Sequence, residues 1–504
     1  MTTPACSTPG DEGRKNILQA GDVCYNNIVK TQGQAPLWEA LLNYRRQRLN
    51  SWHTPGHKDG AYTWPSWRQA LGEETLGLDL TEVPGLDNLA CPDGAIRAAQ
   101  EKAAAFYGAA RTFFLVNGAS SGLMAVILAT CRPGDEVLLP RYAHRSVFNG
   151  LILSGARPVY METEWLASPG LPLGVTPAVL ARTLQAHPRA RLLLLVHPTY
   201  EGIVPHSREL IALAHDHGLA VLVDAAHGAH FGLDPMLPPS PLALGGDYVV
   251  QSTHKTMGSL TQAAMLHLRE AGTGDAIAAA LNLLQTTSPS YLLLASLDVA
   301  RLRAEERGRR DWGRAVAGAL WLREKLAAAG IPCLDPADVT GPAASGLDVT
   351  RLLLPVAPFG ASGPEVAAFL RRAGQEIELA GPDYILLIIT PGDGGAKIKS
   401  LLEALLVLPR VAGPLPPAAS RKGGASPGPW TVPPRQALTP REAWLAPRRE
   451  MPLREAEGRI AAELIAPCPP GLALVVPGEV LSEEVLARLA EIRGKEGRVL
   501  VIDE

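Results

Sequence analysis

The sequence lacks several features that would assign it to a specialised class of protein. Its six cysteines are scattered over 504 residues without C-x-x-C spacing, which argues against a zinc site or a disulfide framework. No apolar run approaches the about 20 residues that a membrane span needs, and the polar N-terminus has no apolar signal core. The net charge of −3 gives no global electrostatic reason to bind nucleic acid or an anionic membrane. We therefore expect a soluble cytoplasmic protein without a metal site.

The length of 504 residues exceeds what one hydrophobic core supports, so several domains are expected. The apolar share of 47% and the charged share of 19% are ordinary for a globular protein. Composition and apolar patterning divide the chain into a flexible N-terminal tail (1–34), a large domain (35–300), a small α/β domain (301–408), a linker rich in proline and glycine (409–440) and a C-terminal domain (441–504).

Short apolar runs alternate with helical patterns in the large domain. Strand and helix in alternation predict crossover units, an α/β fold and a mostly parallel sheet. Near-continuous apolar runs are typical of strands that are buried on both faces. The segment 296–330 predicts a long helix or a pair of helices. The predicted strands are 112–116, 136–140, 157–161, 191–196, 219–224, 247–251 and 263–268.

Polar stretches follow several of these runs, at the strand ends where open α/β sheets bind ligands. The stretch 117–122 follows one strand and begins a helix. Its backbone N–H groups, with the hydroxyls of Ser120 and Ser121, can hold a phosphate. An ordinary strand-to-helix turn with serine capping fits the same pattern. Asp224 ends another run, where its carboxylate can pair with a buried cation or cap the next turn.

A lysine stands just beyond the run 247–251, in the stretch Ser252-x-His254-Lys255. Lysine usually lies in solvent, so a surface lysine past a strand end is one interpretation. In a partly dry pocket its amine pKa falls, and the amine can attack an aldehyde. A phosphate-binding turn, a carboxylate for a ring nitrogen and an amine for an aldehyde are together what pyridoxal 5′-phosphate needs. We therefore predict that this cofactor binds where the three stretches converge.

Several stretches are similar, in order, to the Orn/Lys/Arg decarboxylase family of pyridoxal-phosphate enzymes. They include HTPGHKDG (53–60), VNGASSG (116–122), VDAAHGAH (223–230) and QSTHKTMGSLTQ (251–262). The resemblance runs from about residue 35 to the C-terminus and is to the short form without an N-terminal wing. It implies an aspartate-aminotransferase-like large domain, a small α/β domain and a C-terminal α+β decarboxylase domain. It also implies a homo-oligomer, a dimer or a multiple of dimers.

The activity that the resemblance implies is decarboxylation of a basic amino acid to its amine and carbon dioxide, in polyamine metabolism. Arginine is favoured over lysine and ornithine by analogy with other short forms. Two other functions stay open: an aminotransferase or aldolase-type lyase on the same fold, and a non-catalytic regulator that binds the cofactor or a polyamine.

The resemblance also implies roles for single residues. Lys255 resembles the lysine that binds the cofactor covalently, and Asp224 resembles the partner of the pyridinium nitrogen. His144 resembles a residue that stacks on the cofactor ring, with a surface histidine in a loop as the alternative. The expected catalytic residues are Lys255, Asp224, His144 and His254. The expected cofactor-binding residues are these four with Gly118, Ala119, Ser120, Ser121, His227, Ser252 and Thr287.

Some positions stay ambiguous or depart from the family pattern. Residues 286–288, which include Thr287, resemble a segment that reaches a neighbouring subunit's site, but they also fit a polar helix cap. His197 stands where the family commonly has asparagine, Ala225 where it commonly has an acidic residue, and Cys468 where an aromatic residue is common. A basic substrate calls for carboxylates, and the candidates by position are Asp79, Glu82, Asp87, Glu201 and Glu479.

Overall fold

The structure is a computed structural model that describes residues 34–411, 434–467 and 471–503. The predicted tail up to residue 33, most of the predicted linker and Cys468 lie outside the described residues. Among the helices of the described ranges, none is long and apolar enough to cross a membrane.

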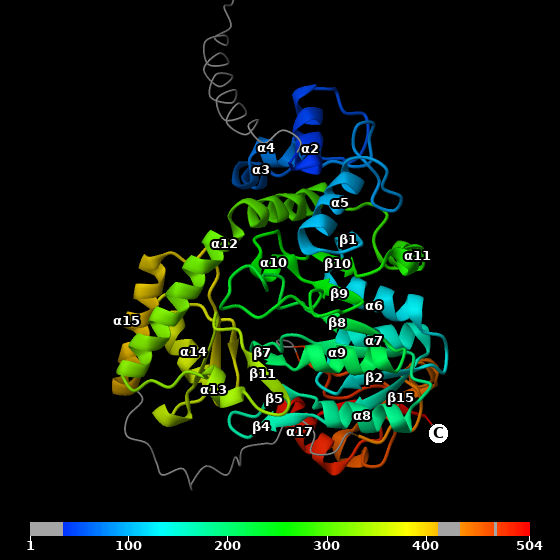
Figure 1. Ribbon diagram of the computed structural model, residues 1–504, viewed down its shortest axis with the longest axis vertical. Coiled ribbons are helices and arrows are strands. Elements are labelled where there is room, and N and C mark those ends of the chain that lie inside the picture. Colours follow the sequence, from blue (N-terminus) through cyan, green and yellow to red (C-terminus); the bar gives the residue numbers. More distant parts are fainter. Residues whose placement is uncertain (1–33, 412–433, 468–470, 504) are drawn as a thin grey trace, which may run out of the picture.

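Seven strands form the central sheet: β1 (Arg111–Leu115), β2 (Glu136–Pro140), β3 (Arg157–Met161), β6 (Leu192–Val196), β8 (Ala220–Asp224), β9 (Tyr248–Gln251) and β10 (Ala264–Leu268). All seven predicted strands are therefore present, in the order β1-β10-β9-β8-β6-β2-β3 (Figure 1). Strand β10 is antiparallel to both neighbours, and the pairs from β9 to β3 are parallel. The prediction of a mostly parallel sheet is confirmed.

Helices cover both faces of this sheet, which explains the unbroken apolar runs. Successive side chains of a strand point to opposite faces. Leu192 and Leu194 accordingly pack in one apolar cluster, and Leu193 and Leu195 pack in another. The first cluster includes side chains of α6 (Gly118–Thr130), α7 (Arg145–Ser154) and α11 (Gly274–Leu284), and the second those of α8 (Pro177–Ala186) and α9 (Ser207–Asp216).

The predicted helix or helix pair at 296–330 is one continuous helix, α12 (Tyr291–Ala328). It runs through the predicted boundary between residues 300 and 301. Its first half packs in an apolar cluster with helices from the N-terminal part of the described chain, and its second half joins a cluster beneath a smaller sheet. The N-terminal helices are α2 (Pro36–Arg46), α3 (Pro65–Leu71), α4 (Glu73–Leu76) and α5 (Ala95–Tyr107).

The smaller sheet lies to one side of the central sheet, with its helices on the left of Figure 1. It has the antiparallel order β12-β14-β13, formed by β12 (Arg351–Pro355), β13 (Leu379–Ala380) and β14 (Tyr384–Ile388). The helices of this part are α13 (Pro336–Val339), α14 (Gly363–Arg372) and α15 (Gly395–Val411). A ladder between β7 (Ile203–Pro205) and β11 (Ala344–Leu347) connects the two parts.

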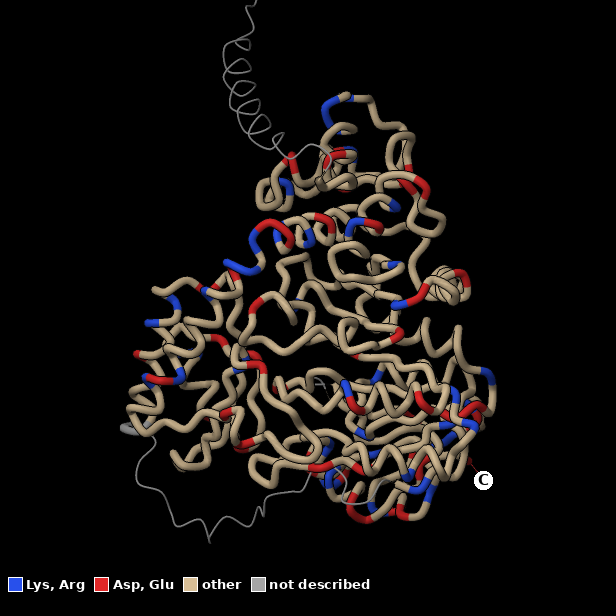
Figure 2. Tube along the Cα trace, viewed as in Figure 1, with Lys and Arg blue, Asp and Glu red and all other residues tan. Residues whose placement is uncertain are grey.

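A separate C-terminal part packs beside the carboxyl end of β2, at the bottom of Figure 1. It contains α16 (Pro440–Leu445), β15 (Arg448–Pro452), α17 (Glu483–Arg493) and β16 (Arg498–Ile502). The remaining elements are the hairpin β4 (Glu164–Leu166) with β5 (Leu171–Gly174), the short helix α10 (Thr253–Thr256) and the 3-10 turns η2 (Ala271–Thr273), η3 (Ala357–Phe359) and η5 (Leu453–Glu455). Along α12, eight Lys and Arg side chains outnumber five Asp and Glu side chains, whereas both signs of charge are mixed over the C-terminal part (Figure 2).

Candidate active site

A cavity of about 350 Å³ lies at the carboxyl ends of the parallel strands. The segments that follow β1, β2, β6, β8 and β9 all contribute to its walls, as expected for a ligand site of an open α/β sheet. The predicted site residues among its walls are Gly118, Ala119, Ser120, His144, Asp224, His227, Ser252, His254 and Lys255.

The turn between β1 and α6 presents backbone N–H groups to this cavity. Gly118 has φ of 74°, in the left-handed region that favours glycine, and begins the helix. Asn117 precedes it without making a side-chain cap. The hydroxyl of Ser121 donates to the Gly118 carbonyl at 2.9 Å, so Ser121 closes the turn and does not line the cavity. The uncapped start of α6, with Ser120 beside it, suits an anionic group.

Lys255 lies at the cavity wall, in the one-turn helix α10 that follows β9. Its Nζ is 2.7 Å from Nε2 of His227 and 6.0 Å from the ring centroid of Tyr200. Burial, reinforced by the charge of Lys255, holds the pKa of His227 well below its usual value. A neutral His227 therefore accepts the hydrogen bond from Lys255 at Nε2 and carries its own proton on Nδ1.

Asp224 and His144 lie on other walls of the same cavity. Asp224 is buried at the end of β8, and its Oδ1 accepts a hydrogen bond from the Ala226 N–H at 3.1 Å. His144 caps α7 by accepting from the Ser146 N–H at Nδ1. Burial lowers the pKa of His144, the charge of Asp224 opposes this, and Lys255 adds to it. The imidazole ring is therefore neutral and presents an apolar face, which suits stacking on a flat ligand.

A glycine of the C-terminal part makes room for His144. Gly471 has φ of 81°, and a Cβ at this position would lie 2.9 Å from Nε2 of His144. The Gly471 carbonyl also accepts a hydrogen bond from the Arg145 N–H at 3.1 Å. Its neighbour Leu472 lines the cavity, so the C-terminal part forms one wall of the site.

The donor set of the cavity fits pyridoxal phosphate. An uncapped helix start suits the phosphate, Asp224 suits the ring nitrogen, and Lys255 suits the aldehyde. In addition, Nδ1 of His227 is buried without a hydrogen-bond partner among the described residues. A buried donor is costly unless it is paired, so this atom is suited to an acceptor supplied by a ligand.

Three positions discussed from the sequence lie away from the cavity. Thr287 is exposed, in the segment that follows α11. His197 is fully buried between the Ser207 hydroxyl, 2.8 Å from Nδ1, and the Pro239 carbonyl, 3.3 Å from Nε2, and burial lowers its pKa to about 4. Ala225 is also buried, and its N–H donates to the Val250 carbonyl at 2.9 Å.

Of the five carboxylates proposed for a basic substrate, only Glu201 lines the cavity. Asp87 accepts from the N–H groups of Gly94 and Ile96 and thus caps α5. The other three carboxylates have partners elsewhere in the protein. Glu479 forms an ion pair with Arg141, Asp79 lies 3.2 Å from His57, and Glu82 accepts a hydrogen bond from the Thr81 hydroxyl. The geometry therefore leaves one of the five candidates, Glu201.

Sequence reasoning missed several cavity residues. Tyr142 and Ser146 belong to a stretch at the end of β2 that follows the same strand-end logic as the residues that were found. Leu472 had no local signal, because it comes from a distant segment of the chain. The missed lining residues are Leu123, Tyr142, Ser146, Pro172, Val196, Pro198 and Leu472.

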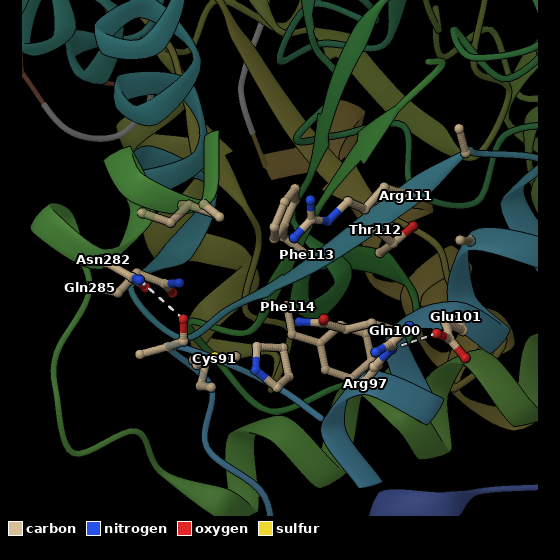
Figure 3. A pocket seen from close by; sticks show the side chains of 17 residues that line it. Cys91, Arg97, Gln100, Glu101, Arg111, Thr112, Phe113, Phe114, Asn282 and Gln285 are labelled. Atoms are coloured by element: carbon tan, nitrogen blue, oxygen red, sulfur yellow. Dashed lines mark hydrogen bonds and ion pairs between the residues drawn. The ribbon is translucent and has the colours of Figure 1, made fainter. Parts of the chain in front are cut away.

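A larger cavity, about 530 Å³, lies between α5, β1 and α11 (Figure 3). Its charged side chains already have partners: Arg97 pairs with Glu101 at 2.9 Å and Arg111 with Asp275 at 3.1 Å. None of the predicted site residues lines it. Size alone does not make it the reaction site, because it lacks the amine, the carboxylate and the anion-binding turn.

The fold and the cavity define a pyridoxal-phosphate-dependent enzyme with a mostly parallel central sheet. Sequence comparison identifies the family. The family profile described as "Orn/Lys/Arg decarboxylase, major domain" matches residues 35–347, and "Orn/Lys/Arg decarboxylase, C-terminal domain" matches residues 430–493. The chain belongs to the Orn/Lys/Arg decarboxylase family, which confirms the resemblance, the cofactor and the decarboxylase class predicted from the sequence.

Individual relatives agree with this family. The arginine decarboxylase of Bacillus subtilis is 37% identical over 457 residues, covering 90% of this chain and 92% of the relative. That of Halalkalibacterium halodurans is 35% identical over 471 residues, covering 92% and 94%. Among solved structures, lysine decarboxylase A of Pseudomonas aeruginosa superposes with a TM-score of 0.81 at 23% identity, covering 96% of this chain and 82% of the other. At that identity the likeness shows the fold alone.

Proposed function

We propose that this chain is an arginine decarboxylase. Family membership establishes a decarboxylase of basic amino acids. The observation that carries the choice of arginine is the identity of 37% and 35% to two arginine decarboxylases, over at least 90% of this chain and of each relative.

The proposed roles follow from the cavity. Lys255 would hold the cofactor covalently, and Asp224 would pair with the ring nitrogen and keep it protonated. The N–H groups of Ala119 and Ser120, with Ser252, would hold the phosphate, and His144 would stack on the ring. All of these residues line the cavity. Bound pyridoxal phosphate supplies an electron sink for the electron pair left when carbon dioxide departs.

The proton that replaces carbon dioxide at the α-carbon would come from Lys255 and not from His254. His254 Nδ1 lies 3.0 Å from the Ala263 carbonyl, so it carries a proton and donates to that oxygen. Burial lowers the pKa of His254, the Ala263 carbonyl opposes this, and Lys255 adds to it. A neutral His254 therefore has an unprotonated Nε2, which accepts hydrogen bonds and cannot supply a proton. Lys255 is the remaining donor of the two.

We also propose a cytoplasmic homodimer, or a multiple of dimers, that acts in polyamine metabolism. Thr287 and its neighbours are exposed and lie outside this cavity. That position supports the expectation that the segment serves the site of a neighbouring subunit. Sedimentation of the cofactor-loaded protein tests this, and a monomer would contradict it.

The test of function is release of labelled carbon dioxide from carboxyl-labelled arginine, lysine and ornithine. We expect the highest kcat/KM with arginine and one amine, agmatine, as the co-product. The Lys255→Ala variant is the control, because it measures any carbon dioxide that is released without the active site. Preference for lysine or ornithine would overturn the choice of substrate. Transfer of the amino group without carbon dioxide release would favour the aminotransferase alternative.

A further inference from the structure

Two cavities meet at Lys255. The candidate active-site cavity lies on one side, and a second cavity of about 480 Å³ shares His254 and Lys255 with it. Each contains a buried carboxylate that is not needed to hold the cofactor, Glu201 in the first and Asp311 in the second. A basic substrate needs an anionic partner at the end of its side chain, because a buried unpaired charge is strongly disfavoured.

Asp311 is already neutralised by the protein. Its carboxylate lies 2.6 Å from Arg314, 2.8 Å from Arg303 and 3.6 Å from Arg310. These three guanidinium groups around one carboxylate leave a local excess of positive charge. A guanidinium or ammonium group of a substrate would be repelled there.

Glu201 has no such partner. It is 3% exposed, and the Tyr384 hydroxyl donates to its Oε1 over a long distance of 3.5 Å. No ion pair to Glu201 exists among the described residues; the charge of Arg351 reaches it, but Arg351 lies 3.6 Å from Asp348 and donates to the His227 carbonyl. Burial raises the pKa of Glu201, and the hydrogen bonds and Arg351 oppose this. An incoming cation would offset the cost of the buried charge.

Two tyrosines line the same cavity as this carboxylate. Tyr142 and Tyr200 both line the cavity with Glu201. Burial raises the pKa of both phenols, and the nearby charge of Glu201 raises each further. A guanidinium group is planar, stacks on aromatic faces and pairs with carboxylates through two parallel hydrogen bonds. A cavity lined by a carboxylate and two tyrosines matches these properties.

We propose that Glu201 binds the cationic end of the substrate side chain, with Tyr142 and Tyr200 as the walls of that subsite. Tyr200 stands next to Glu201 in the chain and lies near Lys255, so the methylene chain of the substrate would pass Tyr200. This inference rests on the proposed function, because it presumes a basic amino acid as substrate.

The test is Glu201→Gln in the full chain loaded with pyridoxal phosphate. Arginine is compared with norvaline, which has the same α-amino acid group but no cationic side chain. We expect KM for arginine to rise about tenfold to a hundredfold, the range for a hydrogen bond to a charged group. The dissociation constant of norvaline, measured from the change in cofactor absorbance, should stay within about twofold, on the order of 0.4 kcal/mol. The cofactor absorbance of the variant without amino acid should also match the wild type.

Glu376→Gln is the matched control. Glu376 is exposed, pairs with Arg371 at 3.0 Å and does not line the cavity. This change should leave KM for arginine unchanged. If Glu201→Gln fails to fold, Glu201→Asp replaces it, because the shorter acid keeps the charge and should raise KM for arginine but not the dissociation constant of norvaline.

The outcomes separate the two proposals. An unchanged KM for arginine in the Glu201 variant, or equal weakening of arginine and norvaline, overturns the subsite. If the wild type decarboxylates lysine or ornithine instead of arginine, the proposed function fails, and the same comparison with that substrate decides the role of Glu201. A wild type that decarboxylates none of the three overturns both.

Discussion

The buried ion pair between Arg141 and Glu479 is expected to hold the C-terminal part against the active-site cavity. The two side chains are 3% and 2% exposed. Nε of Arg141 donates to Oε1 of Glu479 at 3.0 Å, and Nη2 donates to Oε2 at 2.9 Å. The Val476 N–H also donates to Oε2 at 2.8 Å. This pair therefore joins the end of β2 to the segment that carries Leu472 into the cavity wall.

Replacement of both partners should cost far less than the sum of the two single changes. Glu479→Ala leaves the Arg141 guanidinium buried without its carboxylate, which costs about 3–5 kcal/mol. Apolar replacement of both partners, as in Arg141→Met with Glu479→Leu, is often neutral. Here Arg141 also donates to the carbonyls of Ala473 and Leu474, and each carbonyl left unpaired costs about 1–3 kcal/mol. The two carbonyls together cost about 2–6 kcal/mol. We therefore expect the double variant to be about as unstable as Glu479→Ala, and far more stable than the sum of the two single changes predicts.

The assay is urea unfolding of the wild type, both single variants and the double variant, followed by circular dichroism. Cofactor fluorescence in the same samples reports whether the cofactor stays bound in the cavity. The C-terminal part affects this binding because its Gly471 packs on His144, which lines the cavity. Glu479→Ala should release the cofactor at a lower urea concentration than the wild type does. The reasoning is refuted if Glu479→Ala costs less than about 1 kcal/mol, or if the costs of the two single changes simply add in the double variant.

Three further predictions concern single residues. Asp224→Ala should slow carbon dioxide release greatly while absorbance still shows bound cofactor, and near-normal turnover would contradict the electron-sink role. Lys255→Ala should abolish borohydride trapping of the cofactor. If borohydride still attaches the cofactor to the tryptic peptide of this variant that contains position 255, a group other than Lys255 forms the bond. His197 titrates near pH 4 in the folded chain instead of 6.5, so only the unfolded chain gains a proton between these values. Above pH 6.5 protonation of His197 does not affect the free energy of unfolding. As the pH falls from 6.5 to 4, protonation of His197 in the unfolded chain lowers the free energy of unfolding by about 3 kcal/mol. His197→Asn should remove that part of the pH dependence in urea unfolding, and an unchanged slope would show that other groups cause it.

The central sheet could be predicted because its signal is local. A strand covered by helices on both faces needs apolar side chains at every position, so each of the seven strands stands out as a short run. The continuity of α12 could not be decided in the same way. Its first half packs in one apolar cluster and its second half in another, so the apolar pattern of the sequence fits one helix or two.

The strand-end rule brought most of the candidate site residues to one cavity for a geometric reason. Parallel strands place their carboxyl ends on one edge, so Asp224 at the end of β8 and Lys255 after β9 converge without information from distant segments. Contacts between distant segments lie beyond that rule. Leu472 reaches the cavity only because the C-terminal part docks there, and the contact of Lys255 with His227 depends on side-chain directions that the sequence does not encode locally.

Acidic residues show most clearly where sequence reasoning ends. Asp87 and Glu201 are both buried carboxylates next to family motifs, and the neighbouring sequence does not distinguish their roles. The difference lies in their partners. The carboxylate of Asp87 accepts backbone N–H groups at the start of α5, which hold the pKa of Asp87 below its usual value against the opposing effect of burial. Glu201 lines the cavity, its hydrogen bond from the Tyr384 hydroxyl is long at 3.5 Å, and burial raises its pKa. Glu201 lines the same cavity as Lys255 and has no ion pair among the described residues, so of the two carboxylates it is the one that we propose for a cationic substrate.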